Sequence, residues 1–390
     1  MRITLATALL VALAVTAAGQ PPKADSKPDQ KAEKADQKAD PKADAKADPK
    51  AAAKGPPTPQ YPTQIGGKDL DKWIREIDHP DPSQKVSAIN TVLGFGPNAK
   101  RAIPVLIRTL RNVNNDMSVR AHAVYALRQL VPLDLQNYGK EAVDALTVAL
   151  DSSQQTVKVQ AAHALWAIGP AARVSVPKLS KLVVDRTVSF EIRQAAALAL
   201  GRVAYDDQGG PSIQALNFLL DGVDDPSKEV RMECLQSIIN LGPPAQGASA
   251  QYKNLLERRI KAEKDNSARI WVRVALMRLD AAFINETNLN EIAKLMKEME
   301  DLDIRVQSAR AIGYIGPAAK SMVPALISAL PDPEPLMVWQ VIWSLAQMVK
   351  FAEPALPHLK KIAADDKVDA GIREAARKAI ETIEADMKKK

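Results

Sequence analysis

Five side chains in this chain belong to the types that most often act as nucleophiles, proton carriers or metal ligands: four histidines and one cysteine. The residues after His79, His122, His163 and His358 are Pro, Ala, Ala and Leu, so none starts a His-Glu pair or an HExxH zinc motif. Cys234 has no base beside it in the sequence and no second cysteine with which to form a disulfide. No P-loop lysine follows the Gly pairs, and no Gly-x-Ser-x-Gly elbow is present. We therefore expect no catalytic residues, no cofactor and no metal.

Three of these residues, His122, His163 and Cys234, lie in copies of one segment. It reads VRAHAVYAL from Val119, VKVQAAHAL from Val157, IRQAAALAL from Ile192, VRMECLQSI from Val230 and IRVQSARAI from Ile304. We call the first residue of each copy its anchor; successive anchors lie 38, 35, 38 and 74 residues apart. Because the last gap is twice 37, a degenerate copy is expected near Ile270 or Val272. Repeats of this period predict a solenoid, in which each unit buries its apolar side against its neighbours.

Each unit is expected to be an antiparallel pair of helices. Aliphatic and small residues recur within the segment at a period of 3.6, which is typical of a helix packed on one side. Three units run into Gly-Pro, at Gly96-Pro97, Gly169-Pro170 and Gly316-Pro317. A second proline follows each Gly by eight residues, at Pro104, Pro177 and Pro324. Gly ends a helix and Pro favours the first turn of the next one. Cys234 falls on a small-residue position of its copy, which predicts a buried thiol.

The segment IRVQSARAIGYIGPAA, residues 304–319, closely echoes VKVQAAHALWAIGPAA from Val157. In this pattern residues 65–390 resemble the HEAT-repeat family, in the short form related to phycobilisome lyase repeats. The resemblance implies an all-α fold: a right-handed α-solenoid of about nine helix pairs, with weaker anchors at Gln84, Met337 and Ile372. It also implies a scaffold more than an enzyme, although a lyase-like or hydroxylase-like activity stays open as an alternative. The HEAT-like hydroxylases depend on His-Glu pairs, which this sequence lacks.

The amino-terminal region differs in composition from the repeats. Residues 1–19 have the form of a secretory signal peptide, and no lipoprotein cysteine follows them. Residues 20–64 are rich in Lys, Ala, Asp and Pro and are expected to form a disordered linker. We therefore expect a bacterial exported protein, periplasmic or extracellular, whose mature chain has no transmembrane segment. An uncleaved anchor at residues 1–19 is the alternative, and the linker serves either as a spacer from an envelope surface or as a free tail.

The net charge of +7 is concentrated outside the repeats, since residues 65–387 carry only +1. This balance argues against nucleic acid as a partner. One basic stretch could bind an anionic envelope polymer, through Arg258, Arg259, Lys261, Arg269 and Arg273.

A second basic pattern follows the anchors, at Arg120, Lys158, Arg193, Arg231 and Arg305. We call this set the basic ladder. Acids in the preceding turns, Asp116, Asp225 and Asp303, are expected to pair with it and to tie each turn to a helix. The ladder is therefore predicted to be structural.

The positions three, six and ten residues after each anchor form a separate side of the helix, which we call the stripe. Residues on it and beside it combine Tyr, Trp, His and Arg, the mixture expected of a recognition surface. The candidates for partner binding are His122, Tyr125, His163, Trp166, Arg310, Tyr314, Trp339 and Trp343. Ordinary packing between units is the alternative explanation. The sequence thus predicts a non-catalytic scaffold that binds a protein or peptide, with a charge-driven polymer binder as the other possibility.

Overall fold

The computed structural model describes residues 61–206, 209–243 and 249–389. The chain divides into two units, Met1–Pro59 and Gln60–Lys390, and the described residues belong to the second. The expected signal peptide, and the expected linker as far as residue 60, lie outside the described residues. Among the residues that are described, no helix is long and apolar enough to cross a bilayer.

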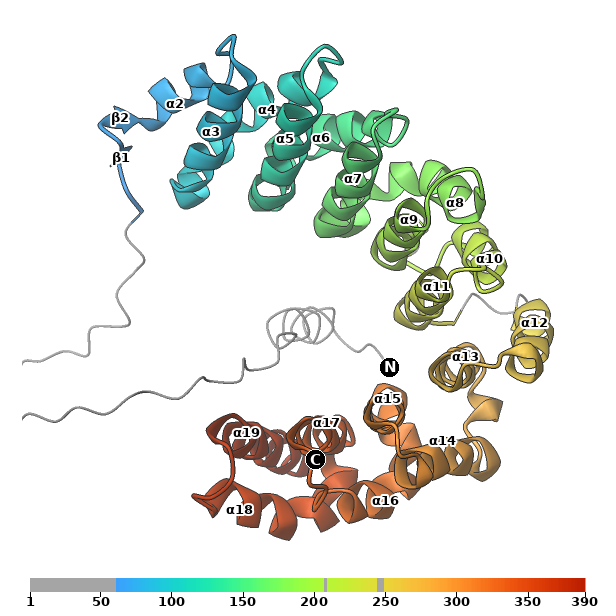
Figure 1. The fold of residues 1–390 in the computed structure, drawn as a ribbon. Coiled ribbons are helices and arrows are strands. Elements are labelled where there is room, and N and C mark those ends of the chain that lie inside the picture. Colours follow the sequence, from blue (N-terminus) through green and yellow to red (C-terminus); the bar gives the residue numbers. More distant parts are fainter. Residues whose placement is uncertain (1–60, 207–208, 244–248, 390) are drawn as a thin grey trace, which may run out of the picture. The chain divides into compact units, whose positions relative to one another are not determined.

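The second unit consists of helices in two rows (Figure 1). The inner row is α3 (Pro82–Leu93), α5 (Met117–Leu130), α7 (Gln155–Ile168), α9 (Phe190–Val203), α11 (Lys228–Leu241), α13 (Asn266–Leu279), α15 (Leu302–Ile315), α17 (Pro335–Gln347) and α19 (Ala370–Met387). The outer row is α2 (Leu70–Glu76), α4 (Ile103–Arg111), α6 (Leu135–Ala149), α8 (Val176–Val184), α10 (Ile213–Gly222), α12 (Ser249–Ala262), α14 (Glu286–Glu298), α16 (Val323–Ser328) and α18 (Leu356–Ala364).

Each outer helix packs on the inner helix that follows it, and each inner helix packs on the next inner helix. Nine helix pairs are therefore present in the described part of the chain, which confirms the predicted architecture. Short 3-10 segments join several helices: η1 (Gly96–Ala102), η2 (Val131–Leu133), η3 (Gly169–Ser175), η4 (Ala281–Phe283), η5 (Gly316–Met322) and η6 (Val349–Ala355). A two-stranded antiparallel hairpin, β1 (Gln64–Ile65) and β2 (Lys68–Asp69), precedes α2, with Gln64 opposite Asp69.

Two of the Gly-Pro junctions end inner helices as predicted, since Gly169 and Gly316 are the C-caps of α7 and α15. The third differs, because α3 ends at Leu93 with Gly94 as its C-cap, two residues before Gly96. Gly96, Gly169 and Gly316 have positive φ angles of 59°, 73° and 69°, a conformation in which a Cβ would be strained. The prolines eight residues further on each lie at the start of an outer helix, where their missing N–H is not needed.

The predicted anchors lie three residues after the N-cap of their helices in eight of the nine pairs. The exception is α13. Its N-cap is Asp265, so its anchor is Ala268, and the expected anchor at Ile270 or Val272 is wrong. An alanine in place of the usual large aliphatic residue concealed the position. With Ala268 as the anchor, Arg269 belongs to the basic ladder and Trp271 to the stripe.

Neighbouring inner helices approach most closely at small residues. A Cβ on Gly201 would lie 2.8 Å from Ser237 Cβ and 2.9 Å from its Cα, and one on Gly313 would lie 2.5 Å from the Trp343 ring. At the same two places serine hydroxyls donate across the interface, from Ser237 to the Ala197 carbonyl and from Ser344 to the Ala309 carbonyl, each at 2.8 Å.

Candidate partner-binding surface

The two polar sides of the inner helices differ in their partners. On one side the basic ladder reaches the turns between units. Arg193 donates to Asp225 from Nε at 2.8 Å and from Nη2 at 3.0 Å, and Arg231 donates from Nε to Glu263 at 3.1 Å. Arg305 pairs with Asp332. These three arginines tie units together, but each bonds an acid in the turn of the following unit. The expected pairing with Asp116 and Asp303 is wrong, and Arg120 instead donates to the Leu110 carbonyl and to Ser152 and Gln154.

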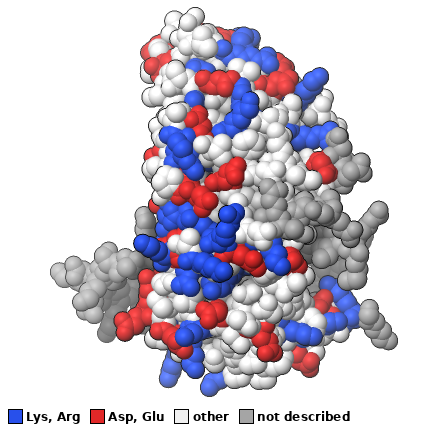
Figure 2. Space-filling view, turned by 90° about the vertical axis from the view of Figure 1, so that its right-hand side faces the viewer, with Lys and Arg blue, Asp and Glu red and all other residues white. Residues whose placement is uncertain are grey.

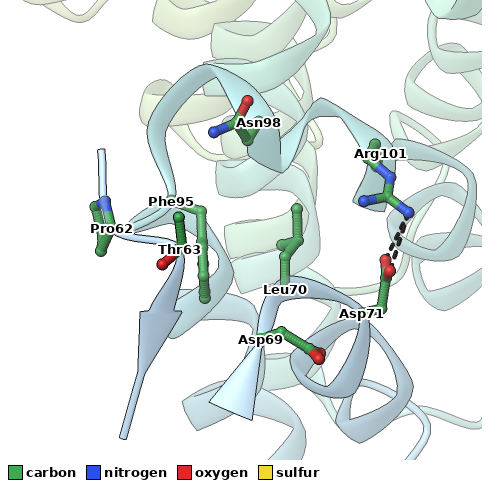
Figure 3. A pocket seen from close by; sticks show the side chains of 8 residues that line it. All are labelled: Pro62, Thr63, Asp69, Leu70, Asp71, Phe95, Asn98 and Arg101. Carbon is green, nitrogen blue, oxygen red and sulfur yellow. Dashed lines mark hydrogen bonds and ion pairs between the residues drawn. The ribbon is translucent and has the colours of Figure 1, made fainter. Parts of the chain in front are cut away.

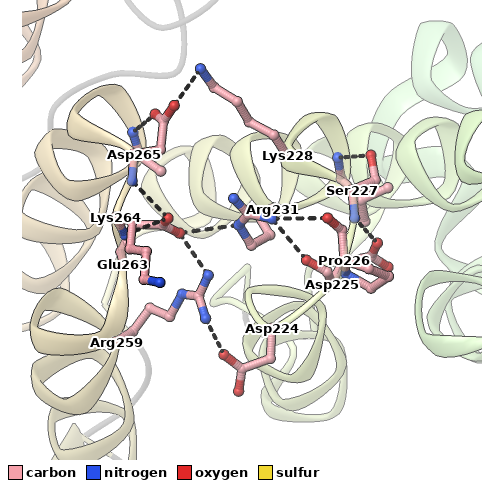
Figure 4. A network of polar contacts seen from close by, with 12 residues as sticks. Asp224, Asp225, Pro226, Ser227, Lys228, Arg231, Arg259, Glu263, Lys264 and Asp265 are labelled. Atoms are coloured by element: carbon pink, nitrogen blue, oxygen red, sulfur yellow. Dashed lines mark hydrogen bonds and ion pairs between the residues drawn. The ribbon is translucent and has the colours of Figure 1, made fainter.

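Figure 4 shows this arrangement where α10 and α11 meet α12 and α13. Arg231 lies between the two turns and donates to the Asp225 carbonyl at 3.0 Å as well as to Glu263. Arg259 completes the network through Glu263 at 2.6 Å and Asp224 at 3.0 Å. The network fixes the joint between two units. The stripe residues of α11 take no part in this network.

The stripe carries a cluster of aromatic rings on three successive inner helices. Tyr314 of α15 lies between Trp271 of α13 and Trp343 of α17. The Tyr314 ring meets Trp271 edge to face, with centroids 5.4 Å apart, and meets Trp343 at a tilt, with centroids 5.6 Å apart. Aromatic pairs in such geometries contribute beyond their buried area. We call Trp271, Tyr314, Trp343 and Arg310 the aromatic cluster.

Arg310 lies over two of these rings, 5.8 Å from the Trp271 centroid and 5.5 Å from the Tyr314 centroid. Its Nη2 is also 3.4 Å from the Tyr314 hydroxyl. The Trp271 ring is held in place by Gln307, whose Oε1 accepts a 3.1 Å hydrogen bond from the indole Nε1. The cluster therefore holds rings of fixed orientation beside a positive charge, and the rings of Tyr314 and Trp343 are only partly buried.

The structure brings together three of the predicted site residues, Arg310, Tyr314 and Trp343. Trp339, also predicted, lies on α17 and is half-buried against the core. Trp271, which the sequence analysis missed, completes the cluster and is 3% exposed. The signal that would have found it is the N-cap Asp265 followed by Arg269 at the ladder position, which together set the register of α13.

The other four predicted residues lie on α5 and α7. Tyr125 is 42% exposed, whereas the Nδ1 atom of His122 is 2.7 Å from the Ser118 carbonyl of its own helix. Burial, with a smaller effect of Arg128, lowers the pKa of His163, so this ring is neutral at physiological pH. Trp166 packs beneath the Arg202 guanidinium, which lies 4.7 Å from the ring centroid. This second pairing of an arginine with an aromatic ring is on the same side of the inner row.

The basic residues proposed to bind an anionic polymer are divided between two helices. Arg258, Arg259 and Lys261 lie on outer helix α12, whereas Arg269 and Arg273 lie on inner helix α13. Arg259 is engaged with carboxylates, and Arg273 is buried, with Glu291 3.8 Å away. Burial, with a smaller effect of Arg269, lowers the pKa of Arg273. Figure 2 shows that Lys and Arg on the face of the outer row are interspersed with Asp and Glu.

Two further features of the described residues are a buried cysteine and a surface hollow. Cys234 is buried, and burial raises the pKa of its thiol, which opposes formation of a thiolate. A hollow of about 290 Å³ lies beside β2 and η1, where Leu70 and Phe95 form its apolar wall and Asp71 pairs with Arg101 (Figure 3). In the described part of the chain, no group of His, Cys, Asp and Glu side chains is placed to hold a metal ion.

Comparisons with known proteins agree with this architecture. The family model of HEAT repeats matches residues 289–381. Among solved structures, a mutant of Kap121p aligns over 82% of this chain and 38% of its own, with a TM-score of 0.52 and 15% identity. Kap121p bound to Pho4p and Kap121p bound to Nup53p each align over 80% of this chain and 37% of their own, with TM-scores of 0.51 and 14% identity.

This chain spans about two fifths of the length of the Kap121p structures, and at such identities the likeness concerns the fold alone. No curated protein matches the chain. The fold and the family match define the class of protein: an α-solenoid of stacked helix pairs. More narrowly, residues 289–381 of this solenoid match the family model of HEAT repeats.

Proposed function

We propose that this chain is a non-catalytic scaffold that binds a partner protein or peptide along the stripe of its inner row. The observation that carries the proposal is the aromatic cluster, in which Trp271, Tyr314 and Trp343 from three successive inner helices meet in ring contact beside Arg310. The apolar side of each inner helix already packs on its outer helix. Each inner helix also packs on the next one, and the stripe residues Arg310, Tyr314 and Trp343 keep part of their surface exposed for a partner.

The composition of the stripe supports binding of a protein more than of a small molecule. Trp, Tyr and Arg are the residues that most often dominate protein interfaces, and Trp and Tyr bury a large area at little cost in side-chain entropy. Truncating such an anchor typically costs about 2 kcal/mol or more of binding free energy. Solenoid repeats place equivalent positions side by side, so an extended partner can contact several units in turn.

Selection from a peptide library tests the proposal directly. The library is selected against the full chain, and the affinity of the selected peptides is measured for Trp343→Ala and for Val148→Ala. Val148 is an apolar residue on the outer helix α6 and is 66% exposed, so it provides the matched control. We expect Trp343→Ala to weaken binding at least about tenfold and Val148→Ala to leave it unchanged. Equal affinities of the parent and Trp343→Ala would overturn the proposal.

Export is a further part of the proposal and rests on the sequence of residues 1–19 alone. We propose that these residues direct the chain to the periplasm or beyond, and that residues 20–64 act as a spacer. Amino-terminal sequencing of the chain purified from its native cells tests this. A mature protein that begins after residue 19 supports export with cleavage, whereas an intact amino terminus in a cytoplasmic fraction contradicts it.

A further inference from the structure

Two sets of arginines on the inner row have different surroundings. Arg193, Arg231 and Arg305 of the basic ladder are bonded to carboxylates of the chain itself. Those of the stripe are Arg202, Arg278 and Arg310. Within the described residues, none of these three makes an ion pair or a hydrogen bond to a carboxylate. Arg202 and Arg310 lie instead over aromatic rings.

The charged residues of the stripe are accordingly mostly positive. Over helices α5 to α17, its positions hold these three arginines and a single acid, Glu233. Burial raises the pKa of Glu233 to about 7, so even this carboxyl is only partly charged at neutral pH. The rest of the described chain is nearly balanced in charge, which makes the surplus on the stripe a local property.

A guanidinium that rests on a ring keeps its N–H edge available for a planar acceptor. Carboxylates accept two parallel hydrogen bonds from this edge, a geometry that lysine cannot offer. Because the aromatic ring holds the side chain in place, less conformational entropy is lost when the acceptor binds. The Arg202 guanidinium lies over the Trp166 ring and the Arg310 guanidinium over the Tyr314 ring, so both are held in place before a carboxylate binds.

We propose that the segment bound along the stripe is an extended acidic peptide whose Asp and Glu carboxylates pair with Arg202, Arg278 and Arg310. This inference rests on the proposed function and specifies the chemistry of its partner. The partner is a peptide because aromatic rings lie beside Arg202 and Arg310, so apolar side chains of the same segment have surfaces on which to pack.

The arrangement of the arginines predicts a spacing of the acids. Arg202, Arg278 and Arg310 lie on α9, α13 and α15, which are inner helices separated by two layers and then by one. Packed helices lie roughly 10 Å apart, and an extended chain advances about 3.3 Å per residue, so one layer corresponds to about three residues. An acidic peptide that matches the stripe therefore carries acids at about its first, seventh and tenth positions.

The test uses a fluorescent peptide with Glu at these three positions, Leu or Tyr between them, and Gln and Ser elsewhere. A second peptide has Gln in place of every Glu. Fluorescence anisotropy measures both against the full chain, against Arg202→Gln/Arg310→Gln, and against Arg101→Gln/Arg108→Gln. The last variant removes two exposed arginines away from the stripe and so matches the change in charge. Thermal unfolding of each variant shows that the fold is retained.

We expect the parent to bind the Glu peptide at least about tenfold more tightly than the Gln peptide, with an affinity that falls as salt rises. The stripe variant should lose this preference, and the matched variant should keep it. Equal binding of the two peptides, no binding of the Glu peptide, or an unchanged preference in the stripe variant would overturn the inference.

Two further outcomes separate this inference from the proposed function. If the Gln peptide binds as tightly as the Glu peptide and Trp343→Ala abolishes both, the scaffold proposal stands and the acidic specificity fails. A single-stranded oligonucleotide of equal charge is the competing macromolecule. If it binds more tightly than the Glu peptide and depends on Arg202 and Arg310, a peptide is the wrong occupant.

Discussion

Arg193 and Asp225 form a two-point ion pair between consecutive repeats, with Nε to Oδ2 at 2.8 Å and Nη2 to Oδ1 at 3.0 Å. The carboxylate is fully buried and also contacts Arg186 and accepts from the Ser227 N–H at 2.8 Å. Arg193 is 6% exposed. The contact joins α9 to the turn that precedes α11, so it fixes the angle between two units of the solenoid.

Loss of one member of this pair should be strongly destabilising. Asp225→Ala leaves a buried guanidinium without its acceptor, and we expect a loss of about 3–5 kcal/mol in the free energy of unfolding. Asp78→Ala, which removes an exposed partner of Arg108, should cost no more than about 1 kcal/mol. Urea unfolding followed by circular dichroism compares the two. Similar losses would show that the buried pair does not brace the joint.

The close approach of neighbouring helices predicts an unusual response to alanine. Gly→Ala in a helix normally stabilises it by up to about 1 kcal/mol. At Gly201 the added methyl would meet the backbone and Cβ of Ser237 within 3 Å, which requires the two helices to separate. Overpacking of this kind costs about 1–3 kcal/mol, so we expect Gly201→Ala to lower the free energy of unfolding. A melting temperature equal to or above that of the parent would contradict the packing.

Stability should fall with rising pH because of Glu233. Burial raises its pKa to about 7, against an ordinary value of 4.5. The folded chain therefore holds this proton more tightly than the unfolded chain, and folding loses up to about 3 kcal/mol as pH rises from 4.5 to 7. Glu233→Gln should remove this dependence and stabilise the chain at pH 8. Unfolding curves at pH 5 and pH 8 test this, and an unchanged pH response in the variant would contradict the environment assigned to Glu233.

Trp271 should matter mainly for stability. The ring is buried, meets Tyr314 and donates to Gln307. We expect Trp271→Ala to cost about 3–5 kcal/mol, as is usual for the loss of a buried large aromatic residue. Trp343→Ala, at a half-buried position, should cost less in stability while still weakening partner binding. Equal losses of stability in the two variants would place Trp343 in the core rather than at the surface.

Much of the fold could be predicted because glycines and anchor residues mark where the helices of the repeat end and how they are aligned. Gly169 and Gly316 end inner helices, and the anchors set the register of eight helices. The register of α13 could not be read from apolar periodicity, because its anchor is an alanine and almost every residue of the helix is buried. Trp271 was missed for this reason.

The partners of the basic ladder could not be predicted from spacing. Arg193 and Arg231 bond acids 32 residues ahead, whereas Arg305 bonds one 27 residues ahead. Turn length varies between units, so only the three-dimensional stacking determines which acid is near. The stripe was predictable as one side of a helix, but the contact of Tyr314 with both Trp271 and Trp343 depends on how three helices are tilted together.

The central claim, that partners bind along the stripe, is tested most directly by photo-crosslinking in the native cells. A photoreactive residue is placed in the full chain at Gln347, on the stripe of α17, or at Val148, on outer helix α6. We predict a discrete crosslinked partner from position 347 and none from position 148. A partner captured from position 148 and not from position 347 would place the binding surface on the outer row and contradict this account.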